Sequence, residues 1–590
     1  MNLRIRTAAA ALLFLLPVLV PACAPAASRV SQMDPAAVAA AIPANWAFGS
    51  APVVTSAPNA MVVTDAPLAT ETGVAILRAG GNAVDAAVAT AFALAVVYPE
   101  AGNIGGGGFM VTRLADGTVA ALDFREEAPG AATRDMFLDA QGRPTERSIT
   151  GHLASGVPGA VAGLWTAHQR FGKLPWKDVV APAIALAENG FTVDRELAGS
   201  VRDAAERIAQ FPGAAALLLP NGQPIAQGSQ WRNPDLAAVL RRIADRGPAG
   251  FYEGETADLI VAEMRRGGGI ITQQDLKNYR AKWREPVQFD YRGHRVIAMP
   301  PASSGGVTLG LIANILEGYD LNALGWHSPA ALHLTAEAMR RAFADRNALL
   351  GDPDFVSVPM QRLTAQSYAD SLRSTIDPAH ATPSSQVRPG LGEVPEPTHT
   401  THFSIVDANG NAVALTTTIN ELYGSGVAVA GAGFFLNDEM DDFTSKPGEP
   451  NMFGLVQGAA NAIVPGKRML SAMTPTIVLD RDGSPLLVTG ARGGPRIITA
   501  VAQVLINVID YDFDIGTAVY APRIHHQHLP DALLTEPSGF TSATTDALRA
   551  MGHTVQPRNG YVGTAPSILR RGGVWTAVPD PRTGGSAAGY

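Results

Sequence analysis

The sequence has little with which to cross-link itself or to bind nucleic acid. Its 590 residues include one cysteine, so no internal disulfide can form and the fold must be stabilised by packing. Charged residues make up only 17%, the net charge is −8, and Lys and Arg form no run, whereas a phosphate backbone requires clustered positive charge. Apolar residues reach 46%, which is ample for a buried core. At this length we expect two large lobes or one unusually large layered domain.

The N-terminus has no apolar run long enough to span a bilayer comfortably and is typical of an export signal. Two arginines precede the apolar residues 7–20, and small residues follow. The ending V-P-A-C places Cys23 as in a bacterial lipobox, whose thiol is lipidated after cleavage. In the alternative, cleavage near Ala26–Ala27 discards the cysteine. We expect a signal peptide over residues 1–22, a flexible tether over 23–58 and an exported, periplasmic protein, which the lipobox would anchor to the outer membrane.

Helical and extended patterns alternate after residue 60. The patterns predict strands at Met61–Val63 and Thr118–Phe124 and helices at Leu68–Ala79, Asn82–Val97 and Ala330–Leu350. Ser385–Pro397 is rich in Pro and Gly, has no periodicity and is the clearest interior linker. Directly after it, Thr400–Asp407 alternates polar and apolar residues and is rich in β-branched ones, which predicts a strand. Ala412–Ile419 returns as a second strand.

The turn D-A-N-G-N between these two strands sets which residues face each other. A three-residue loop with its glycine in the left-handed conformation pairs Asp407 with Asn411 and sets Thr400 opposite Thr418. A two-residue Asn-Gly turn would instead pair Thr400 with Ile419 and turn Thr418 to the other face of the sheet. The pairing of Thr400 with Thr418 is a prediction that the structure can refute.

Thr400 stands where the linker meets the strand. A threonine hydroxyl is a poor nucleophile unless a base removes its proton, and one available base is the threonine's own α-amine. That solution requires Thr400 to become a chain terminus. Its hydroxyl could attack the carbonyl of His399, and hydrolysis of the resulting ester would free the amine. The pattern alone is weak, because most Thr-Thr pairs at strand starts are structural.

Many specific segments follow one another from about Pro52 to Tyr590. They include G-G-N-A-V-D-A-A-V-A, L-D-F-R-E, P-P-A-S-S-G-G-V and E-A-M-R-R-A-F-A-D-R before the linker, and T-T-H-F-S-I-V-D, L-N-D-E-M-D-D-F and G-A-R-G-G-P-R-I-I-T after it. In these segments the chain resembles the γ-glutamyltransferase family. The resemblance implies an α+β fold, the four-layer αββα sandwich of the N-terminal-nucleophile hydrolases. It also implies self-cleavage between His399 and Thr400 into a large subunit, 59–399, and a small catalytic subunit, 400–590, which remain together as a heterodimer.

The resemblance also assigns a substrate pocket. A γ-glutamyl group carries a free α-carboxylate and a free α-ammonium, so its pocket needs a cationic and an anionic wall. Arg125 resembles the family's carboxylate-binding arginine, and Ser471 would add a hydroxyl to the same carboxylate. Asn420, Glu439 and Asp442 match the positions that surround the α-amine. Without the resemblance, Arg125 is more typical of a surface ion pair and D-E-M-D-D of a solvated acidic turn.

Further positions carry over to the reacting atoms. Gly493 and Gly494 match the oxyanion-hole pair, where removing one N–H donor typically costs about 10²–10³ in rate. Thr418 matches a position whose hydroxyl assists the nucleophile, in agreement with the three-residue loop. The segment P-G-E-P-N-M-F-G-L-V-Q-G, which begins at Pro447, resembles a lid loop with Phe453 at its tip. Such a lid would exclude water from the acyl-enzyme.

The chain departs from the family pattern at several positions. Ala472 stands where many relatives have a second serine beside Ser471; little is lost if that position uses its backbone N–H, whereas carboxylate affinity falls if it uses the hydroxyl. Arg492 and Pro495 flank the glycine pair where smaller or different residues are common, a difference that can alter the pocket rim. Asp438 is expected to add negative charge to the anionic wall and to favour ammonium-bearing substrates.

We expect no metal and no cofactor. Adjacent histidines in the run His525, His526 and His528 would point to opposite faces of an extended segment, and no Cys or acid lies at ligand spacing. The glycine run Gly105–Gly108 is not followed by the Lys-Ser/Thr of a phosphate loop.

Three functions remain open. The first is γ-glutamyl hydrolysis and transfer, with glutathione and other γ-glutamyl compounds as donors and water, an amino acid or a dipeptide as acceptor. The second is a glutaryl-type cephalosporin acylase of the same fold, against which the retained Asn420, Glu439 and Asp442 argue, since acids without an ammonium partner are costly to bury. The third is a non-catalytic protein, against which the intact Thr400 and its glycine pair argue.

Overall fold

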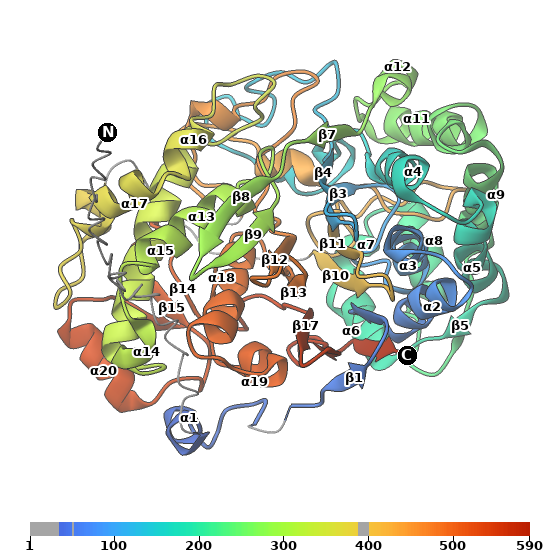
Figure 1. Cartoon of the computed structure of the whole chain (residues 1–590). Coiled ribbons are helices and arrows are strands. Elements are labelled where there is room, and N and C mark those ends of the chain that lie inside the picture. The colour runs from blue at the N-terminus through green and yellow to red at the C-terminus, as the bar shows by residue number, and fades with distance from the viewer. Residues whose placement is uncertain (1–34, 50–51, 388–399, 453) are drawn as a thin grey trace, which may run out of the picture.

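The computed structural model describes residues 35–49, 52–387, 400–452 and 454–590 (Figure 1). The expected signal peptide, Cys23, His399 and the lid tip Phe453 therefore lie outside the described residues. No helix among those described is both long and apolar enough to cross a membrane.

Two seven-stranded sheets form the centre of the molecule, and neighbouring strands within each run antiparallel. The first has the order β19 (Ser586–Gly589), β2 (Met61–Thr64), β10 (Thr401–Val406), β11 (Ala412–Thr418), β3 (Gly107–Arg113), β4 (Val119–Phe124) and β7 (Lys282–Arg284). The second has the order β1 (Thr55–Ala57), β18 (Val574–Val578), β17 (Ser567–Arg571), β13 (Pro485–Thr489), β12 (Thr476–Leu479), β9 (His294–Ala298) and β8 (Val287–Tyr291).

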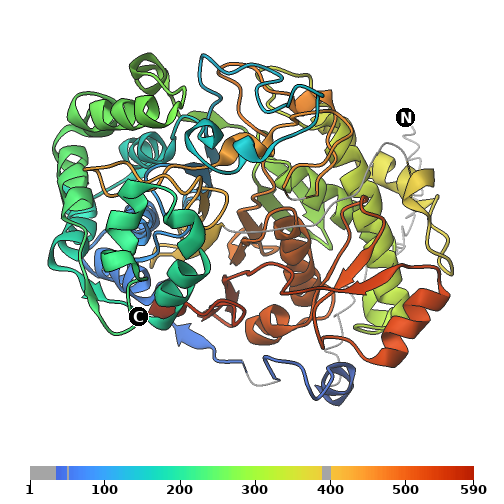
Figure 2. The ribbon, with the colours of Figure 1, turned by 180° about the vertical axis from the view of Figure 1, so that it is seen from behind.

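Strand alternation sends side chains of the first sheet into two different cores. Ile405 and Leu415 pack with the helices α2 (Pro67–Arg78), α3 (Ala83–Val97) and α5 (Trp176–Asn189). Phe109 and Ala414 face the opposite way and pack between the sheets, in a core that continues to α13 (Gly305–Leu316), α15 (Pro329–Leu349) and α18 (Arg496–Ile509). Figures 1 and 2 show these two groups of helices on opposite sides of the sheets. The predicted four-layer αββα sandwich is confirmed.

The predicted strands and helices are present, and their ends are shifted by at most one residue. Helix α3 begins where the sequence indicates, because the Asn82 side chain accepts from the backbone N–H groups of Val84 and Asp85, and Asp85 caps Asn82 in return. Its whole length is buried.

The expectation of a flexible tether through residue 58 is wrong for the part that the structure describes. That part contains a helix, α1 (Pro35–Ala41), and the strand β1, which pairs with β18 near the C-terminus. Trp46 is buried, and its indole N–H donates to the carbonyl of Tyr520 at 3.1 Å. The Ala- and Pro-rich composition indicates a tether, but pairing and burial against distant residues order the segment.

Candidate active site

Thr400 is placed by the hairpin of β10 and β11 in the middle of the first sheet. Thr401 pairs with Thr417 and Val406 with Ala412, so the same register sets Thr400 opposite Thr418. The Asp407 N–H donates to the carbonyl of Asn411 at 3.0 Å, and the turn glycine has φ 84°. The three-residue loop is confirmed, and the two-residue alternative is excluded.

The two threonine hydroxyls meet at the end of this hairpin. The Thr400 hydroxyl donates to the Thr418 hydroxyl at 3.4 Å, and the backbone N–H of Asn420 donates to Thr418 at 2.7 Å. Asn420 has φ 75°, a conformation that few non-glycine residues adopt and that turns the chain sharply after β11. The neighbouring Thr401 hydroxyl donates to Asp65 at 2.9 Å, which connects the strand to the segment after β2.

A small pocket opens at Thr400. It brings together most of the predicted site: Arg125, Thr400, Thr418, Asn420, Glu439, Asp442, Ser471, Ala472 and Gly494. Ser471 is held by its backbone N–H, which donates to the carbonyl of Ala302 at 2.9 Å. A larger hollow near His294 and Arg571 lies elsewhere on the surface and contains none of these residues.

Arg125 is buried against the acids rather than exposed. It is 1% exposed, its Nη1 lies 2.5 Å from Glu439 Oε2, and its Nη2 contacts Asp442. The surface ion pair and the solvated acidic turn that the sequence left open are therefore both wrong. The predicted cationic and anionic walls do not face each other across a gap either, because Arg125 contacts Glu439 and Asp442 directly.

Three buried acids share this one guanidinium. Burial would lower the pKa of Arg125, but the charges of Glu439, Asp442 and Glu126 raise it above its ordinary value. Burial raises the pKa of Glu439 well above its usual range, and Arg125 offsets this only in part. The pKa of Glu126 rises to about 7 for the same reason. The three acids around Arg125 therefore outnumber the guanidinium with which they pair.

The expectation that Asp438 adds charge to the pocket wall is wrong. Asp438 is fully buried, does not line the pocket, and accepts from the backbone N–H of Glu421 at 2.9 Å. Burial raises its pKa well above the usual range, which favours the neutral acid.

The glycine pair lies directly before helix α18. Gly493 has φ 132° and Gly494 has φ 57°, and a Cβ on Gly493 would come within 3.0 Å of the Gly563 Cα. Gly494 lines the pocket at the N-terminus of a fourteen-residue helix, where the dipole favours negative charge. Of the flanking residues, Pro495 lines the pocket, whereas Arg492 contacts the Tyr98 hydroxyl away from it.

The predicted lid segment covers one side of the pocket. Its Leu455 lines the pocket, and Met452 accepts a contact at its sulfur from the Asn420 side-chain amide at 3.3 Å. The backbone N–H of Met452 donates to Asp441 at 2.9 Å, which ties the segment to the acidic turn. Pro447 is exposed and does not line the pocket.

Sequence reasoning missed Arg346, which also lines the pocket. It lies on α15 in the segment E-A-M-R-R-A-F-A-D-R, where three arginines share a buried helix. The segment itself was recognised, but helical spacing alone does not show which arginine reaches the pocket.

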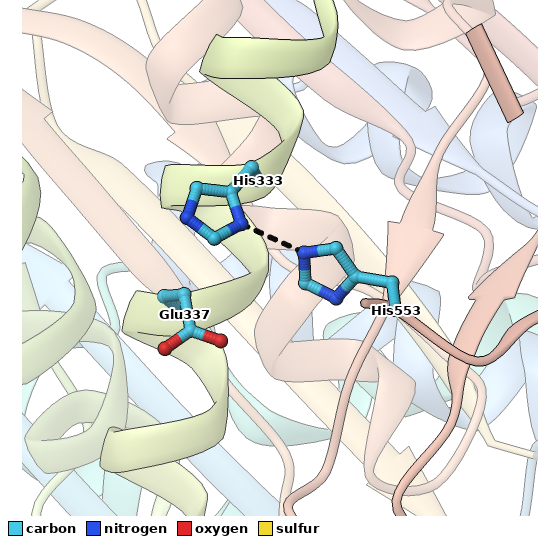
Figure 3. A group of neighbouring side chains, drawn as sticks. All are labelled: His333, Glu337 and His553. Carbon is cyan, nitrogen blue, oxygen red and sulfur yellow. Dashed lines mark hydrogen bonds between the residues drawn. The ribbon is translucent and has the colours of Figure 1, made fainter. Parts of the chain in front are cut away.

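One group of potential metal ligands is found among the described residues: His333, Glu337 and His553 (Figure 3). His333 Nε2 lies 2.8 Å from the carbonyl of Asp377, so it carries the proton, and Nδ1 accepts from His553 Nε2 at 2.8 Å. Glu337 is already bound by two guanidiniums, Arg341 Nη1 at 2.6 Å and Arg340 Nε at 3.1 Å. Because those charges repel a cation, the arrangement indicates a structural network rather than a metal site.

The three histidines His525, His526 and His528 do not share a ligand-binding arrangement, because each ring has its own hydrogen-bond partners. His525 contacts Thr499 and Gln527, His526 Nδ1 accepts from the backbone N–H of His528, and His528 Nε2 faces the carbonyl of Val387.

Paired sheets between helical layers, with a threonine nucleophile candidate at the start of a central strand, define the N-terminal-nucleophile hydrolase fold. Comparison with known proteins agrees. A crystal structure of cephalosporin acylase from Bacillus halodurans superposes with a TM-score of 0.80 at 30% identity, over 93% of this chain and 99% of that one. The Helicobacter pylori gamma-glutamyltranspeptidase structure matches 56% of this chain and 96% of its own, at 46% identity and a TM-score of 0.54.

Sequence comparison identifies the family. The glutathione hydrolase proenzyme of Escherichia coli is 47% identical over 529 residues, which are 89% of this chain and 91% of that protein. Gamma-glutamyltranspeptidase is the family that matches residues 69–590. The chain belongs to the gamma-glutamyltranspeptidase family.

Proposed function

We propose that this enzyme cleaves itself before Thr400 and then acts as a γ-glutamyltransferase and glutathione hydrolase. The observation that carries the proposal is the composition of the pocket beside Thr400. Glu439 and Asp442 line the pocket and, together with Glu126, pair with the single guanidinium of Arg125, so a substrate ammonium would add a cation that these acids can bind. The α-carboxylate of the same substrate would bind the guanidinium that the ammonium releases. A γ-glutamyl group carries both charges on one carbon.

Maturation would begin with the Thr400 hydroxyl, which attacks the carbonyl of His399 and transfers the chain from nitrogen to oxygen. Hydrolysis of this ester leaves a carboxylate on His399 and a free α-amine on Thr400. The two fragments would remain a heterodimer, because β10 of the small subunit pairs with β2 of the large one and β11 pairs with β3. Separation would break the middle of the first sheet.

In the mature enzyme the Thr400 amine would accept the hydroxyl proton as the oxygen attacks the γ-carbonyl. Thr418 would orient that hydroxyl, and the N–H groups of Gly493 and Gly494 would stabilise the oxyanion. The C–N bond then breaks, the leaving amine takes a proton, and a γ-glutamyl ester remains on Thr400. Water or the amine of an amino acid or dipeptide would attack the ester and restore the hydroxyl.

The roles of the remaining residues follow from their positions. Ser471, with Ala472 beside it, would contribute to the carboxylate side of the pocket, and Asn420 to the ammonium side. The segment from Pro447, with Phe453, would limit access of water. Export to the periplasm is part of the proposal and is supported by the basic and apolar N-terminal sequence; a lipid on Cys23 would be the only membrane attachment.

A glutaryl-specific acylase is the second candidate, favoured by the likeness to the Bacillus halodurans acylase. A glutaryl group lacks the ammonium, so Glu439 and Asp442 would stay without a substrate partner. Initial rates on γ-glutamyl and glutaryl p-nitroanilides separate the two, and equal or faster glutaryl turnover would reject the proposed donor. A denaturing gel tests processing: two fragments are expected, and a single band near 61.5 kDa would contradict self-cleavage.

A further inference from the structure

Arg346 brings a second guanidinium to the pocket, and its partners are all neutral. It is 1% exposed and lines the pocket together with Thr400. Its Nε donates to the Ser304 hydroxyl at 3.1 Å, and its Nη1 donates to the side-chain oxygens of Asn347 and Gln457, both at 3.1 Å. Its Nη2 forms no hydrogen bond with any residue that the structure describes.

Two other buried arginines, Arg125 and Arg468, are matched with carboxylates. Arg125 contacts Glu439 and Asp442, and Arg468 lies 2.7 Å from Asp123. Arg346, by contrast, forms no salt bridge within the described residues. Burial lowers its pKa to about 10, and the charge of Asp442 opposes this shift. A buried cation held by neutral oxygens is costly unless an anion reaches it, and the pocket is the side from which an anion can come.

We propose that Arg346 is a second carboxylate-binding residue that, together with Arg125, receives the α-carboxylate of the donor and selects donors that carry one. The inference rests on the proposed γ-glutamyl function and adds the group that sets donor choice. Arg125 is already engaged by its acids, whereas Arg346 has a free donor directed by three fixed bonds. The bond to Gln457 also holds the guanidinium to the lid segment, of which Gln457 is part. Gln457 in turn donates to the carbonyl of Asp442 at 3.2 Å.

Three p-nitroanilide donors test the inference. The γ-glutamyl donor has both charges, the glutaryl donor has only the carboxylate, and the 4-aminobutyryl donor has only the ammonium. For Arg346→Met we expect kcat/KM to fall at least about tenfold on the two carboxylate donors and by less than about twofold on the third, since a hydrogen bond to a charged group is worth roughly 1.5–3 kcal/mol. Where turnover of a donor is too slow to measure, the donor is tested as an inhibitor of γ-glutamyl p-nitroanilide turnover, and its inhibition constant is compared in place of kcat/KM.

Arg346→Lys keeps the charge, so it should show the same preference among the three donors with a smaller loss of kcat/KM. The matched control is Arg295→Met, an exposed arginine paired with Asp290, which should leave all three values unchanged. Self-cleavage and melting temperature report folding; if Arg346→Met is not processed, Arg346→Lys carries the test. Equal loss on all three donors, or no loss, would overturn the inference. Inactivity of the unmodified enzyme on the γ-glutamyl donor would instead reject the proposed function.

Discussion

The protein has two buried ionic clusters, each formed by residues that precede Thr400 and residues that follow it in the chain. Only one of the two has the features of an active site. In the pocket, Glu126, Glu439 and Asp442 share Arg125. On α15 the proportion is reversed, because Glu337 is bound by Arg340 and Arg341. Burial raises the pKa of Glu439, whereas the two guanidiniums hold the pKa of Glu337 below its ordinary value in spite of burial.

The difference shows that buried charge does not by itself mark a site. In the α15 cluster the charges are matched, since Glu337 pairs with both Arg340 and Arg341 and Asp531 also pairs with Arg340. The pocket cluster is incomplete: it has an excess of acid, a free guanidinium donor at Arg346 and a hydroxyl beside open space. A ligand with one ammonium and one carboxylate would complete it.

The largest effect should come from the nucleophile. Thr400→Ala removes the hydroxyl that the proposed function uses twice, so we expect no processing and no measurable γ-glutamyl hydrolysis. Mass spectrometry of the purified chain and an anilide assay measure both, and Thr400→Ser, which keeps a hydroxyl, should retain some of each. Cleavage in the alanine variant would show that another nucleophile acts.

The next largest effect should come from removing one of the three acids that pair with Arg125. Asp442→Asn removes a charge from the proposed ammonium site, and we expect kcat/KM for the γ-glutamyl donor to fall by about 10²-fold, because losing one partner of a buried charge pair typically costs roughly 2–5 kcal/mol. The glutaryl donor has no ammonium and should lose much less. Steady-state rates on both donors decide the matter, and an equal loss would mean that Asp442 acts only through Arg125.

Local chemistry explains which features the sequence predicted. The register of Thr400 and Thr418 follows from five turn residues, and the start of α3 follows from Asn82 and Asp85. Features that depend on distant segments were not predictable in this way. Thr55 pairs with Ala577, more than five hundred residues away, so the segment before it resembles a tether in composition alone.

The pocket was predictable only in part, because its residues follow from the family resemblance whereas their contacts depend on distant segments of the chain. Family resemblance identified Arg125 and the acids, but not that they contact each other directly. The buried orientation of Asp438 and the pocket position of Arg346 depend on how the acidic turn and α15 meet across the chain. No helical or strand periodicity in the sequence predicts that contact between the acidic turn and α15.

The α15 cluster should affect stability and leave catalysis intact. Glu337→Gln leaves two buried guanidiniums with a weaker partner, so we expect the free energy of unfolding to fall by about 3 kcal/mol. The processed variant should keep kcat/KM within about twofold. Denaturant unfolding and anilide rates on the same preparation test both expectations; a tenfold loss of kcat/KM at unchanged stability would place this cluster in the reaction.

The smallest expected effect concerns Glu421, an acid that is buried without a salt bridge to an arginine among the described residues. Burial raises the pKa of Glu421 to about 7, while Arg207 lowers it in part. Because the pKa in the folded state exceeds that of the unfolded chain, the native protein binds more protons between about pH 4.5 and 7, and this group's contribution to stability falls as the pH rises through that window.

Glu421→Gln removes this titration. We expect the variant to be more stable than the unmodified enzyme at pH 7 by at most about 3 kcal/mol, and the difference to shrink towards zero as the pH falls to 4.5. Thermal unfolding of both proteins at several pH values between 4.5 and 8 measures the difference. A constant difference across that range would mean that Glu421 stays ionised, and that a buried acid in this protein can do without either a ligand or a paired arginine.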